Sequence, residues 1–166
     1  ANKAAHALLR AQSAVTRAIH ELERELEVDL FERRAQGMLP TRFGQALLLR
    51  ARLMQAEMER ARRELLPHAS PRGSSRSAPI FDMLVPERRL QIFVALTEQH
   101  HMPSVADSIG VTQPAVSMTI RHFEESIGVE LFDLTARGML PTPAGAILAL
   151  RVKRVLAELS NAIAEI

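Results

Sequence analysis

The feature that most constrains this chain is a stretch that occurs twice, 101 residues apart and without a gap. Residues 12–50 read QSAVTRAIHELERELEVDLFERRAQGMLPTRFGQALLLR, and residues 113–151 read QPAVSMTIRHFEESIGVELFDLTARGMLPTPAGAILALR. Eighteen of the 39 aligned pairs are identical, including the run GMLPT at 37–41 and 138–142. This period is far too long for a solenoid repeat, so the sequence predicts a duplicated domain.

The composition favours a helical fold and excludes several kinds of site. Aromatic residues make up 4% of the chain, with no Trp or Tyr, so the cores must be built from aliphatic residues and Met, as is typical of helical packing. The chain has no Cys, which excludes disulfides, thiolate metal sites and cysteine nucleophiles. No apolar run approaches the ~20 residues that span a bilayer, so we expect no membrane partner and a cytoplasmic location.

Neither a metal site nor a catalytic site is expected. His100 and His101 are adjacent, which cannot turn both rings toward one metal, and no third ligand is near in the sequence. There is no Gly-rich phosphate loop and no nucleophile–base pattern. We therefore expect neither an enzyme nor a cofactor bound by this chain.

The second copy has the more complete pattern of elements. It predicts an amphipathic helix over 87–99, a short helix capped by Ser104, a turn at Gly110, and a helix capped by Thr112 with Pro114 in its first turn. A hairpin over 131–141 follows, and Pro143 begins the last helix. This order of elements is that of a winged helix-turn-helix.

The first copy repeats most of this order with a weaker turn. It predicts a short helix over 4–9, a helix over 12–26, a hairpin around 33–37, and a long helix that Thr41 caps. Leu9, Arg10 and Ala11 stand where the second copy has its turn glycine and cap. The equivalent of helix 87–99 would precede residue 1, which leaves apolar residues such as Ala5, Leu8 and Ile19 without a cover. Met38, like Met139, is expected to fill the core beneath the hairpin.

These elements predict a mainly α chain of two winged helix-turn-helix domains, each followed by a long linker helix. Residues 1–66 form the first domain, without its first helix and with linker helix 42–66. Residues 67–85 form a Pro/Ser/Gly-rich linker. Residues 86–166 form the second domain, with linker helix 143–166.

The two long helices carry an apolar seam whose spacing alternates between four and three residues. Such a seam favours a partner helix, within the chain or in a second copy. The seam residues expected to mediate this pairing are Leu47, Met54, Met58 and Leu65 in the first helix, and Leu148, Val152, Val155, Leu159 and Ile166 in the second.

A set of residues in the second copy carries a family resemblance. They are Ser104, Ala106, the run GVTQPAVS at 110–117, Ile120, Glu124, Gly128, Val129, Leu131, Phe132, Arg137, Gly138, Pro141, Thr142 and Gly145. Residues 86–166, and residues 3–66 with more departures, resemble the DNA-binding domain of the LysR-type transcriptional regulators, a bacterial family.

The resemblance implies a recognition helix in the DNA major groove, a wing beside the minor groove, and linker helices that pair antiparallel into a dimer. Longer family members usually continue into a domain that binds a small-molecule effector. The positions implied to contact DNA are Gln12, Ser13, Thr16, Arg17, His20, Arg33 and Arg34 in the first copy, and Gln113, Pro114, Ser117, Arg121 and Arg137 in the second.

The copies differ at these positions. Ser13 replaces the usual Pro, and Gln36 replaces the usual wing Arg, while the second copy has Met118 and Leu134 where the first has Arg17 and Arg33. The charge differs as well, since residues 1–66 carry 12 basic and 9 acidic groups and residues 85–166 carry 7 and 9.

Three functional interpretations remain open. The first is a sequence-specific transcription regulator in which the two domains act as a single-chain pseudo-dimer on unlike half-sites of double-stranded DNA. The second is a dimer of chains whose long helices pair between copies. The third is a protein-interaction module with degenerate DNA-binding surfaces, which the loss of basic residues in the second copy favours.

Overall fold

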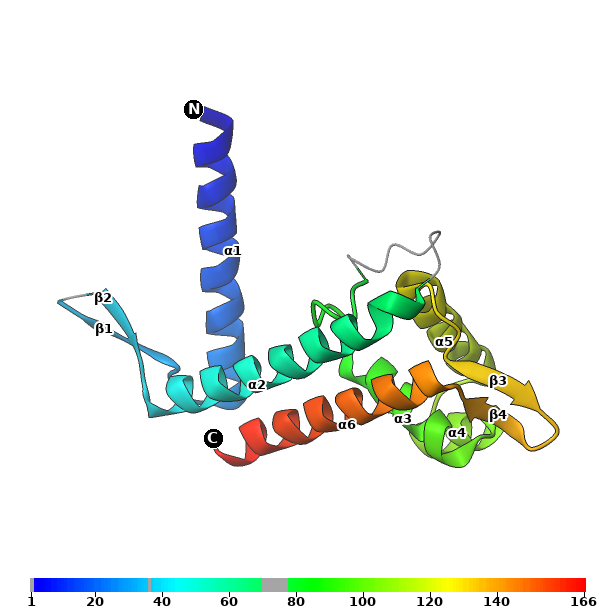
Figure 1. The fold of residues 1–166 in the computed structure, drawn as a ribbon. Coiled ribbons are helices and arrows are strands. Elements are labelled where there is room, and N and C mark those ends of the chain that lie inside the picture. The colour runs from blue at the N-terminus through cyan, green and yellow to red at the C-terminus, as the bar shows by residue number, and fades with distance from the viewer. Residues whose placement is uncertain (1, 36, 70–77) are drawn as a thin grey trace. The chain divides into compact units, whose positions relative to one another are not determined.

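The computed structural model describes the backbone of residues 2–35, 37–69 and 78–166, and the side chains within these ranges from Gln12 onward (Figure 1). Gln36, and the side chains of Ala5 and Leu8, therefore lie outside the described residues. The chain is mainly helical, as predicted. The elements, in order, are α1 (Asn2–Leu26), β1 (Phe31–Arg34), β2 (Gly37–Pro40), α2 (Arg42–Leu65), η1 (Leu66–His68), α3 (Glu87–Gln99), α4 (Met102–Ile109), α5 (Gln113–Ile127), β3 (Phe132–Thr135), β4 (Gly138–Pro141) and α6 (Pro143–Ala164).

The chain divides into two compact units. One unit comprises Ala1–Arg50 with Asn161–Ile166, and the other comprises Ala51–Ser160. We call them the first and second units and describe each by itself.

In the first unit, the predicted break between two helices is wrong, because α1 is one continuous helix from Asn2 to Leu26. Leu9, Arg10 and Ala11 occupy the position of the expected turn, and all three residue types have high helix propensity. No glycine is available there to adopt a left-handed conformation and redirect the chain. The first unit therefore has a helix, a hairpin and a second helix, without a helix-turn-helix corner.

A small hydrogen-bonded frame joins α1, the hairpin and α2 in the first unit. The N–H groups of Leu30 and Phe31 donate to the Glu23 carboxylate at 2.9 and 3.1 Å. The Thr41 hydroxyl caps α2 by accepting from the N–H of Gly44 at 3.2 Å, as predicted. A Cβ on Gly44 would lie 2.1 Å from the Leu30 carbonyl oxygen, so only glycine fits at this contact.

The second unit contains the same frame at the positions 101 residues later. The N–H groups of Leu131 and Phe132 donate to Glu124 at 2.8 and 3.2 Å, and the N–H of Gly145 donates to the Thr142 hydroxyl at 3.0 Å. A Cβ on Gly145 would lie 2.0 Å from the Leu131 carbonyl oxygen. Pro143 begins α6, as predicted.

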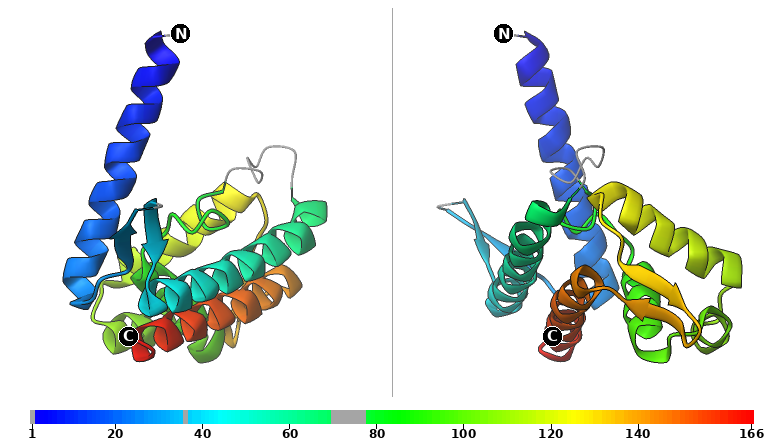
Figure 2. Two further views of the ribbon diagram at one scale, coloured as in Figure 1. Left: turned by 90° about the vertical axis from the view of Figure 1, so that its left-hand side faces the viewer. Right: turned by 45° about the vertical axis from the view of Figure 1, so that its right-hand side comes forward.

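The second unit also contains α3, α4 and α5, which pack against one another and, with the β3–β4 hairpin, give a winged helix-turn-helix (Figures 1 and 2). The ring of Phe93 on α3 meets Phe123 of α5 at a centroid distance of 5.9 Å and Phe132 of β3 at 5.7 Å, both edge-to-face. Phe93 is fully buried. The prediction that α3 is amphipathic is confirmed, with Ile92, Phe93 and Leu96 buried.

The second half of α2 runs alongside α6 within the second unit (Figures 1 and 2). Arg151 near the start of α6 donates to Glu64 near the end of α2 and to Glu57 one to two turns earlier, while Arg154 also reaches Glu57, so the helices are antiparallel. Six of the predicted seam residues are buried, and Leu47, Leu159 and Ile166 are half-buried. The six are Met54, Met58, Leu65, Leu148, Val152 and Val155.

The end of the predicted linker belongs to the core of the second unit. Residues 70–77 lie outside the described residues, but Ala78, Ile80 and Phe81 are buried in the main hydrophobic cluster. The Arg62 guanidinium lies 5.7 Å from the centre of the Phe81 ring and donates to Asp82 at 2.8 Å. We call residues 78–82 the linker anchor, because they attach the linker to α2.

Candidate nucleic-acid interface

The turn between α4 and α5 is built as the sequence predicted. Gly110 ends α4 in the left-handed region with φ +70°, and the N–H of Val111 donates to the Ala106 carbonyl at 2.9 Å. Thr112 is extended, and its hydroxyl accepts from the N–H of Ala115 at 3.3 Å, which caps α5. These local interactions fix the direction in which α5 leaves the corner.

The side chain of Arg88 on α3 stabilises this turn through hydrogen bonds. Its Nη2 donates to the carbonyls of Ile109 and Gly110, both at 2.9 Å. Sequence reasoning missed this residue because the contact joins positions more than 20 residues apart, and an arginine at a helix start carries no local signal for it. Arg88 is therefore a positioning residue for α5.

The predicted cap of α4 is wrong. Ser104 lies inside α4, and the N-cap is His101, whose ring nitrogen Nδ1 accepts from the N–H of Ser104 at 3.4 Å. His101 has the extended backbone of a cap residue, with φ −135° and ψ 108°, whereas Ser104 is already helical. His100 and His101 form the connection between α3 and α4.

Helix α5 has one buried face and one open face. Val116, Ile120 and Phe123 are buried in the core, whereas the side chains predicted to contact DNA lie on the outside. Gln113, Pro114 and Arg121 are exposed, and Ser117 is half-buried. The helix thus presents amide, hydroxyl and guanidinium groups on its open face, which are the groups that read base edges in a major groove.

The wing of the second unit is the antiparallel hairpin of β3 and β4, in which Phe132 pairs with Pro141 and Thr135 with Gly138. Arg137 lies in the exposed turn at its tip, and its N–H donates to the Thr135 hydroxyl at 3.1 Å. The wing is fixed near its tip to the residue that ends α3, since the N–H of Met139 donates to the His100 carbonyl at 2.9 Å.

In the first unit, all five residues of α1 predicted to contact DNA are exposed and together line a shallow hollow of about 580 Å³. They are Gln12, Ser13, Thr16, Arg17 and His20. The Thr16 hydroxyl donates to the Gln12 carbonyl at 2.9 Å, and the His20 ring lies 3.1 Å from Glu23. Burial would raise the pKa of Glu23, but the N–H groups of Leu30 and Phe31 and the His20 ring hold this pKa below its usual value.

The hairpin of the first unit has its basic residues in a strand. Arg33 and Arg34 belong to β1, with Arg33 opposite Met38, and both are exposed. Arg34 forms an ion pair with Glu32 at 2.7 Å. The expectation that Met38 fills a core is wrong, because 51% of it is exposed, whereas Met139 packs against the core of the second unit.

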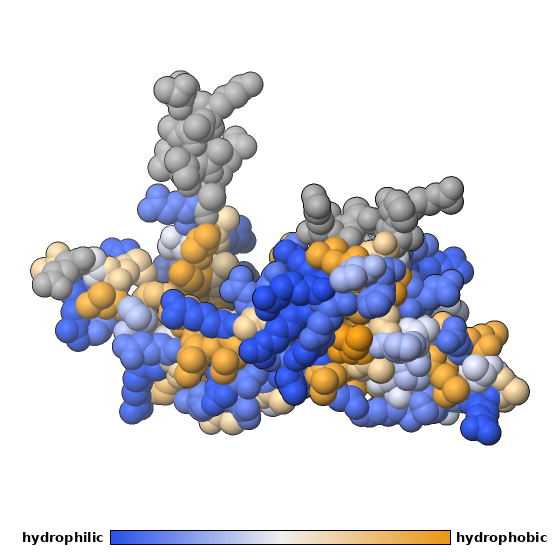
Figure 3. Space-filling model, viewed as in Figure 1, coloured by the Kyte–Doolittle hydropathy of each residue, from blue (hydrophilic) through white to orange (hydrophobic). Residues whose placement is uncertain are grey.

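Apolar side chains of α1 in the first unit are exposed, whereas the equivalent side chains of α5 in the second unit are buried. Figure 3 shows an apolar strip along the described part of α1, where Val15 is 58% and Leu22 is 38% exposed. Their counterparts, Val116 and Phe123, are buried beneath α3 and α4 in the second unit. The two units therefore share a frame but differ in how completely it is covered.

A family model of bacterial regulatory helix-turn-helix proteins, lysR family, matches residues 1–45 and 88–146, more than half of the chain. The chain belongs to the lysR family. The helix-turn-helix of this family corresponds to the α4–α5 corner described above.

Relatives of this lysR-family chain are transcriptional regulators. The HTH-type transcriptional regulator GalR of Pseudomonas putida is 42% identical over 158 residues, which cover 95% of this chain and 38% of the relative. The DNA-binding transcriptional dual regulator OxyR of Escherichia coli is 42% identical over 71 residues, which cover 43% of this chain and 23% of the relative. The chain thus spans well under half the length of either relative.

Solved structures of the family resemble part of this lysR-family chain. The BenM_DBD/benA site 1 DNA complex is 26% identical and covers 49% of this chain and 94% of that chain, with a TM-score of 0.46. The CbnR_DBD–DNA complex is 27% identical and covers 46% of this chain and 88% of that chain, with a TM-score of 0.44.

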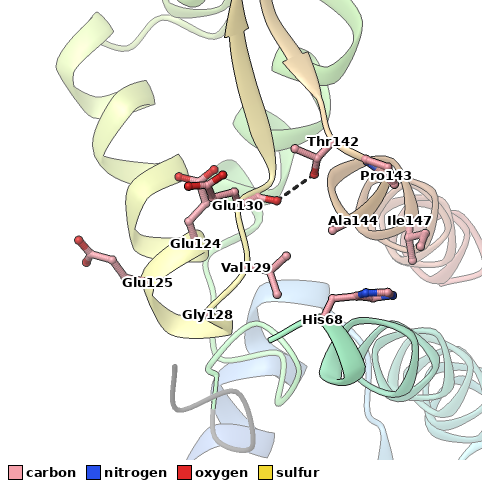
Figure 4. Close-up of a pocket in the computed structure, with 10 residues that line it drawn as sticks. All are labelled: His68, Glu124, Glu125, Gly128, Val129, Glu130, Thr142, Pro143, Ala144 and Ile147. Carbon is pink, nitrogen blue, oxygen red and sulfur yellow. Dashed lines mark hydrogen bonds between the residues drawn. The ribbon is translucent and has the colours of Figure 1, made fainter. Parts of the chain in front are cut away.

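The second unit of the lysR-family chain also has a cleft of about 990 Å³ between the end of α5, the base of the wing and the start of α6 (Figure 4). Its rim carries Glu124, Glu125, Glu130 and His68. The Glu124 carboxylate is already held by two backbone N–H groups, and the Glu130 carbonyl accepts from Thr142 at 2.8 Å. An acidic rim repels phosphates, so this cleft does not extend the predicted DNA surface.

Within the described residues, no group of three or more His, Asp or Glu side chains could hold a metal ion. In the same part of the chain, no helix has the length and apolarity needed to cross a membrane.

Proposed function

We propose that this chain is the DNA-binding part of a LysR-type transcription regulator that carries two unlike DNA-reading units in one polypeptide. The observation that carries the proposal is the α4–α5 corner, where Arg88, Gly110 and Thr112 fix a helix whose open face bears Gln113 and Arg121. A helix with this surface fits the major groove of DNA and offers donors and acceptors to base edges.

Support for a duplicated reading unit comes from the repeated frame around Glu23 and Glu124 and from the paired glycines Gly44 and Gly145. In the proposal, Gln12, Thr16 and Arg17 read one half-site. Gln113, Ser117 and Arg121 read the other. Arg33, Arg34 and Arg137 hold phosphates.

The proposal includes pairing of the long helices within one chain, as α2 and α6 do in the second unit. Because the reading residues differ between the copies, the target is a DNA site with unlike half-sites. Preference for a perfect palindrome would count against this arrangement.

The proposal covers location and ligands as well. A longer family member would be expected to carry a small-molecule effector domain beyond the part that this chain matches, which is 38% of the Pseudomonas relative. We place this chain in the cytoplasm, where bacterial DNA lies, and assign it no catalytic role and no cofactor of its own.

The test compares a base-reading and a phosphate-holding residue in gel-shift titrations at two salt concentrations. Arg121→Ala is expected to weaken binding by about 10- to 100-fold and to relax the base preference at one position, because a bidentate base contact is worth ~1–3 kcal/mol. Arg137→Ala is expected to weaken binding to all sequences equally and to reduce the salt slope by about 0.9.

The same comparison in the first unit uses Arg17→Ala and Arg33→Ala. Arg89→Ala, an exposed arginine of α3 outside the proposed interface, is the matched control and is expected to bind as the unchanged chain does. DNA binding that shows no salt dependence, or that Arg121→Ala and Arg17→Ala leave intact, would overturn the proposal.

A second candidate function is a protein-interaction module. It is favoured by the exposure of Met118 and Leu134, of which 70% and 82% are open to solvent on the recognition helix and the wing. Absence of DNA binding in the titrations above would favour this candidate.

A further inference from the structure

Met118 is an apolar residue that the fold leaves outside. It lies on α5 with 70% of its surface exposed, while Val116, Ile120 and Phe123 of the same helix form the core. An exposed Met gains almost no free energy from the hydrophobic effect in the free chain, because its surface stays in water. Packing within the second unit therefore does not explain why a Met occupies this position.

The neighbours of Met118 on the helix surface are polar or small. Residues three or four positions apart are neighbours on a helix, so Pro114 lies one turn before Met118, and Arg121 and His122 lie one turn after it. All three are exposed. Met118 thus occupies the middle of the open face of α5, the face assigned above to base reading.

The chemistry of the major groove supplies one apolar partner for such a side chain. Base edges there present hydrogen-bond donors and acceptors, and only thymine adds an apolar group, the C5 methyl. Burying a methyl-sized group against an apolar side chain is favourable. A Met has enough length and flexibility to adjust its thioether and terminal methyl to this group.

We propose that Met118 is a specificity-determining residue of the second unit that recognises a thymine through its C5 methyl group. This inference rests on the proposed function, since it requires α5 to enter the major groove. In the first unit the same repeat position carries the exposed Arg17, whose guanidinium suits guanine O6 and N7. The two units then differ in chemistry at one position, with a methyl contact in one half-site and hydrogen bonds in the other.

A docking site for another protein would need a contiguous apolar patch. Met118 is the only large hydrophobic residue exposed on α5, a helix that the structure describes in full, and its neighbours include the cation Arg121. The remaining exposed apolar residue of the reading surface, Leu134, is on β3 rather than on α5. A single large apolar side chain beside Arg121 and His122 fits a mixed base edge better than a protein surface.

The experiment removes only the methyl. A DNA duplex is selected from a random pool with the unchanged chain, and each thymine in it is then replaced in turn by deoxyuridine. One replacement is expected to weaken binding by about fourfold, the effect of losing one methyl-sized apolar contact. With Met118→Ala, that thymine and its deoxyuridine replacement are expected to bind equally well.

Two further variants control the result. Leu84→Ala removes a comparably exposed apolar residue, 75% open to solvent and outside the reading surface, and is expected to keep the preference for thymine over deoxyuridine. Met118→Leu is expected to keep part of it. Because Met118 is exposed, Met118→Ala is expected to have the Tm of the unchanged chain, so a folding defect will not imitate the effect.

Two results would overturn this inference alone. One is equal binding of all deoxyuridine duplexes by the unchanged chain, and another is a thymine preference that survives Met118→Ala. In both, the selected duplex is still bound, so the proposed function stands. Failure to select any DNA, or binding with no salt dependence, would remove the proposed function and this inference together.

Discussion

At the residue scale, Glu57 is the charged group most deeply placed between α2 and α6, with 8% of its surface exposed. Arg151 donates to its carboxylate at 3.0 Å and Arg154 at 3.3 Å, and Arg60 forms a further ion pair with it. A carboxylate in such a position is stabilised only if its partners are present, because burial alone disfavours the charge.

The pKa of Glu57 reflects the balance between burial and these partners. Burial would raise the pKa of Glu57, but hydrogen bonds from Arg151 and Arg154 and the charge of Arg60 hold this pKa below its usual value. A carboxyl whose pKa is lower in the folded than in the unfolded chain stabilises the fold above the unfolded pKa. That contribution is lost as the pH falls through the lower, folded pKa.

Glu57→Gln is therefore expected to lower the free energy of unfolding by ~2 kcal/mol at neutral pH, the usual worth of hydrogen bonds to a charged group. The difference from the unchanged chain should stay constant down to the ordinary carboxyl pKa, 4.5, and shrink below it. Urea unfolding at pH 7, 5 and 3 measures this difference.

The control for this comparison is Glu59→Gln. Glu59 is 49% exposed and meets Arg62 at 3.5 Å, and exposed pairs of this kind contribute at most ~1 kcal/mol. Glu23 and Glu165 also have lowered pKa values, but both proteins in each comparison contain them, so their effects cancel. A Glu57→Gln difference that is the same at pH 7 and pH 3 would contradict the assignment.

At the element scale, the linker anchor shows how a segment outside any helix can belong to the core. Phe81 is 4% exposed, and its ring faces the Arg62 guanidinium of α2. Ile80 and Ala78 are also buried. The anchor thus holds the end of α2 next to the segment that leads into α3.

Phe81→Ala is expected to destabilise the second unit by ~3–5 kcal/mol, because it removes a buried ring and leaves a cavity. Leu84→Ala is the matched control, since Leu84 is three residues away and 75% exposed, and it is expected to cost less than ~0.5 kcal/mol. Thermal or urea unfolding of the two variants measures both values. Equal, small effects would show that the anchor does not contribute to the core.

The same element shows the limit of sequence reasoning. Residues 67–85 were predicted to be a linker from their Pro, Ser and Gly content, and nothing in that composition signals that Ile80 and Phe81 pack against α2. Burial of this kind depends on a neighbour far away in the sequence. Arg88 was missed for the same reason.

Structural features that depend on neighbouring residues in the sequence were predicted more successfully. The Gly110 turn, the Thr41 and Thr112 caps and the second hairpin were predicted correctly, because each depends on residues within a few positions of one another. The predicted break in α1 was wrong because it followed from the alignment with the second copy, whereas residues 9–11 of the first copy are helix-forming. The DNA-contact roles of the exposed residues stay predictions.

At the scale of the whole molecule, the long helices α2 and α6 can pair within one chain, as they do in this structure, or between two chains. The apolar seam alone fits both arrangements, since a seam specifies a partner helix but not its origin. The ion pairs give a way to distinguish them, because Glu57 and Arg151 lie on different helices and have opposite charges.

Glu57→Arg and Arg151→Glu provide the last prediction. Glu57→Arg places a cation beside Arg60, Arg151 and Arg154, and Arg151→Glu places a carboxylate beside Glu57 and Glu64. Each variant is expected to lose ~3 kcal/mol or more, because a buried pair is replaced by like charges. The unchanged chain is expected to sediment with the mass of one chain.

The two variants are then mixed after joint unfolding and refolding. If pairing is between chains, each mixed dimer has one unchanged interface and one with the charges exchanged, so the mixture is more stable than either variant alone. If α2 and α6 pair within the chain, no exchange is possible, and the mixture unfolds as the two separate variants do. We expect the second result, and rescue on mixing would refute the single-chain arrangement.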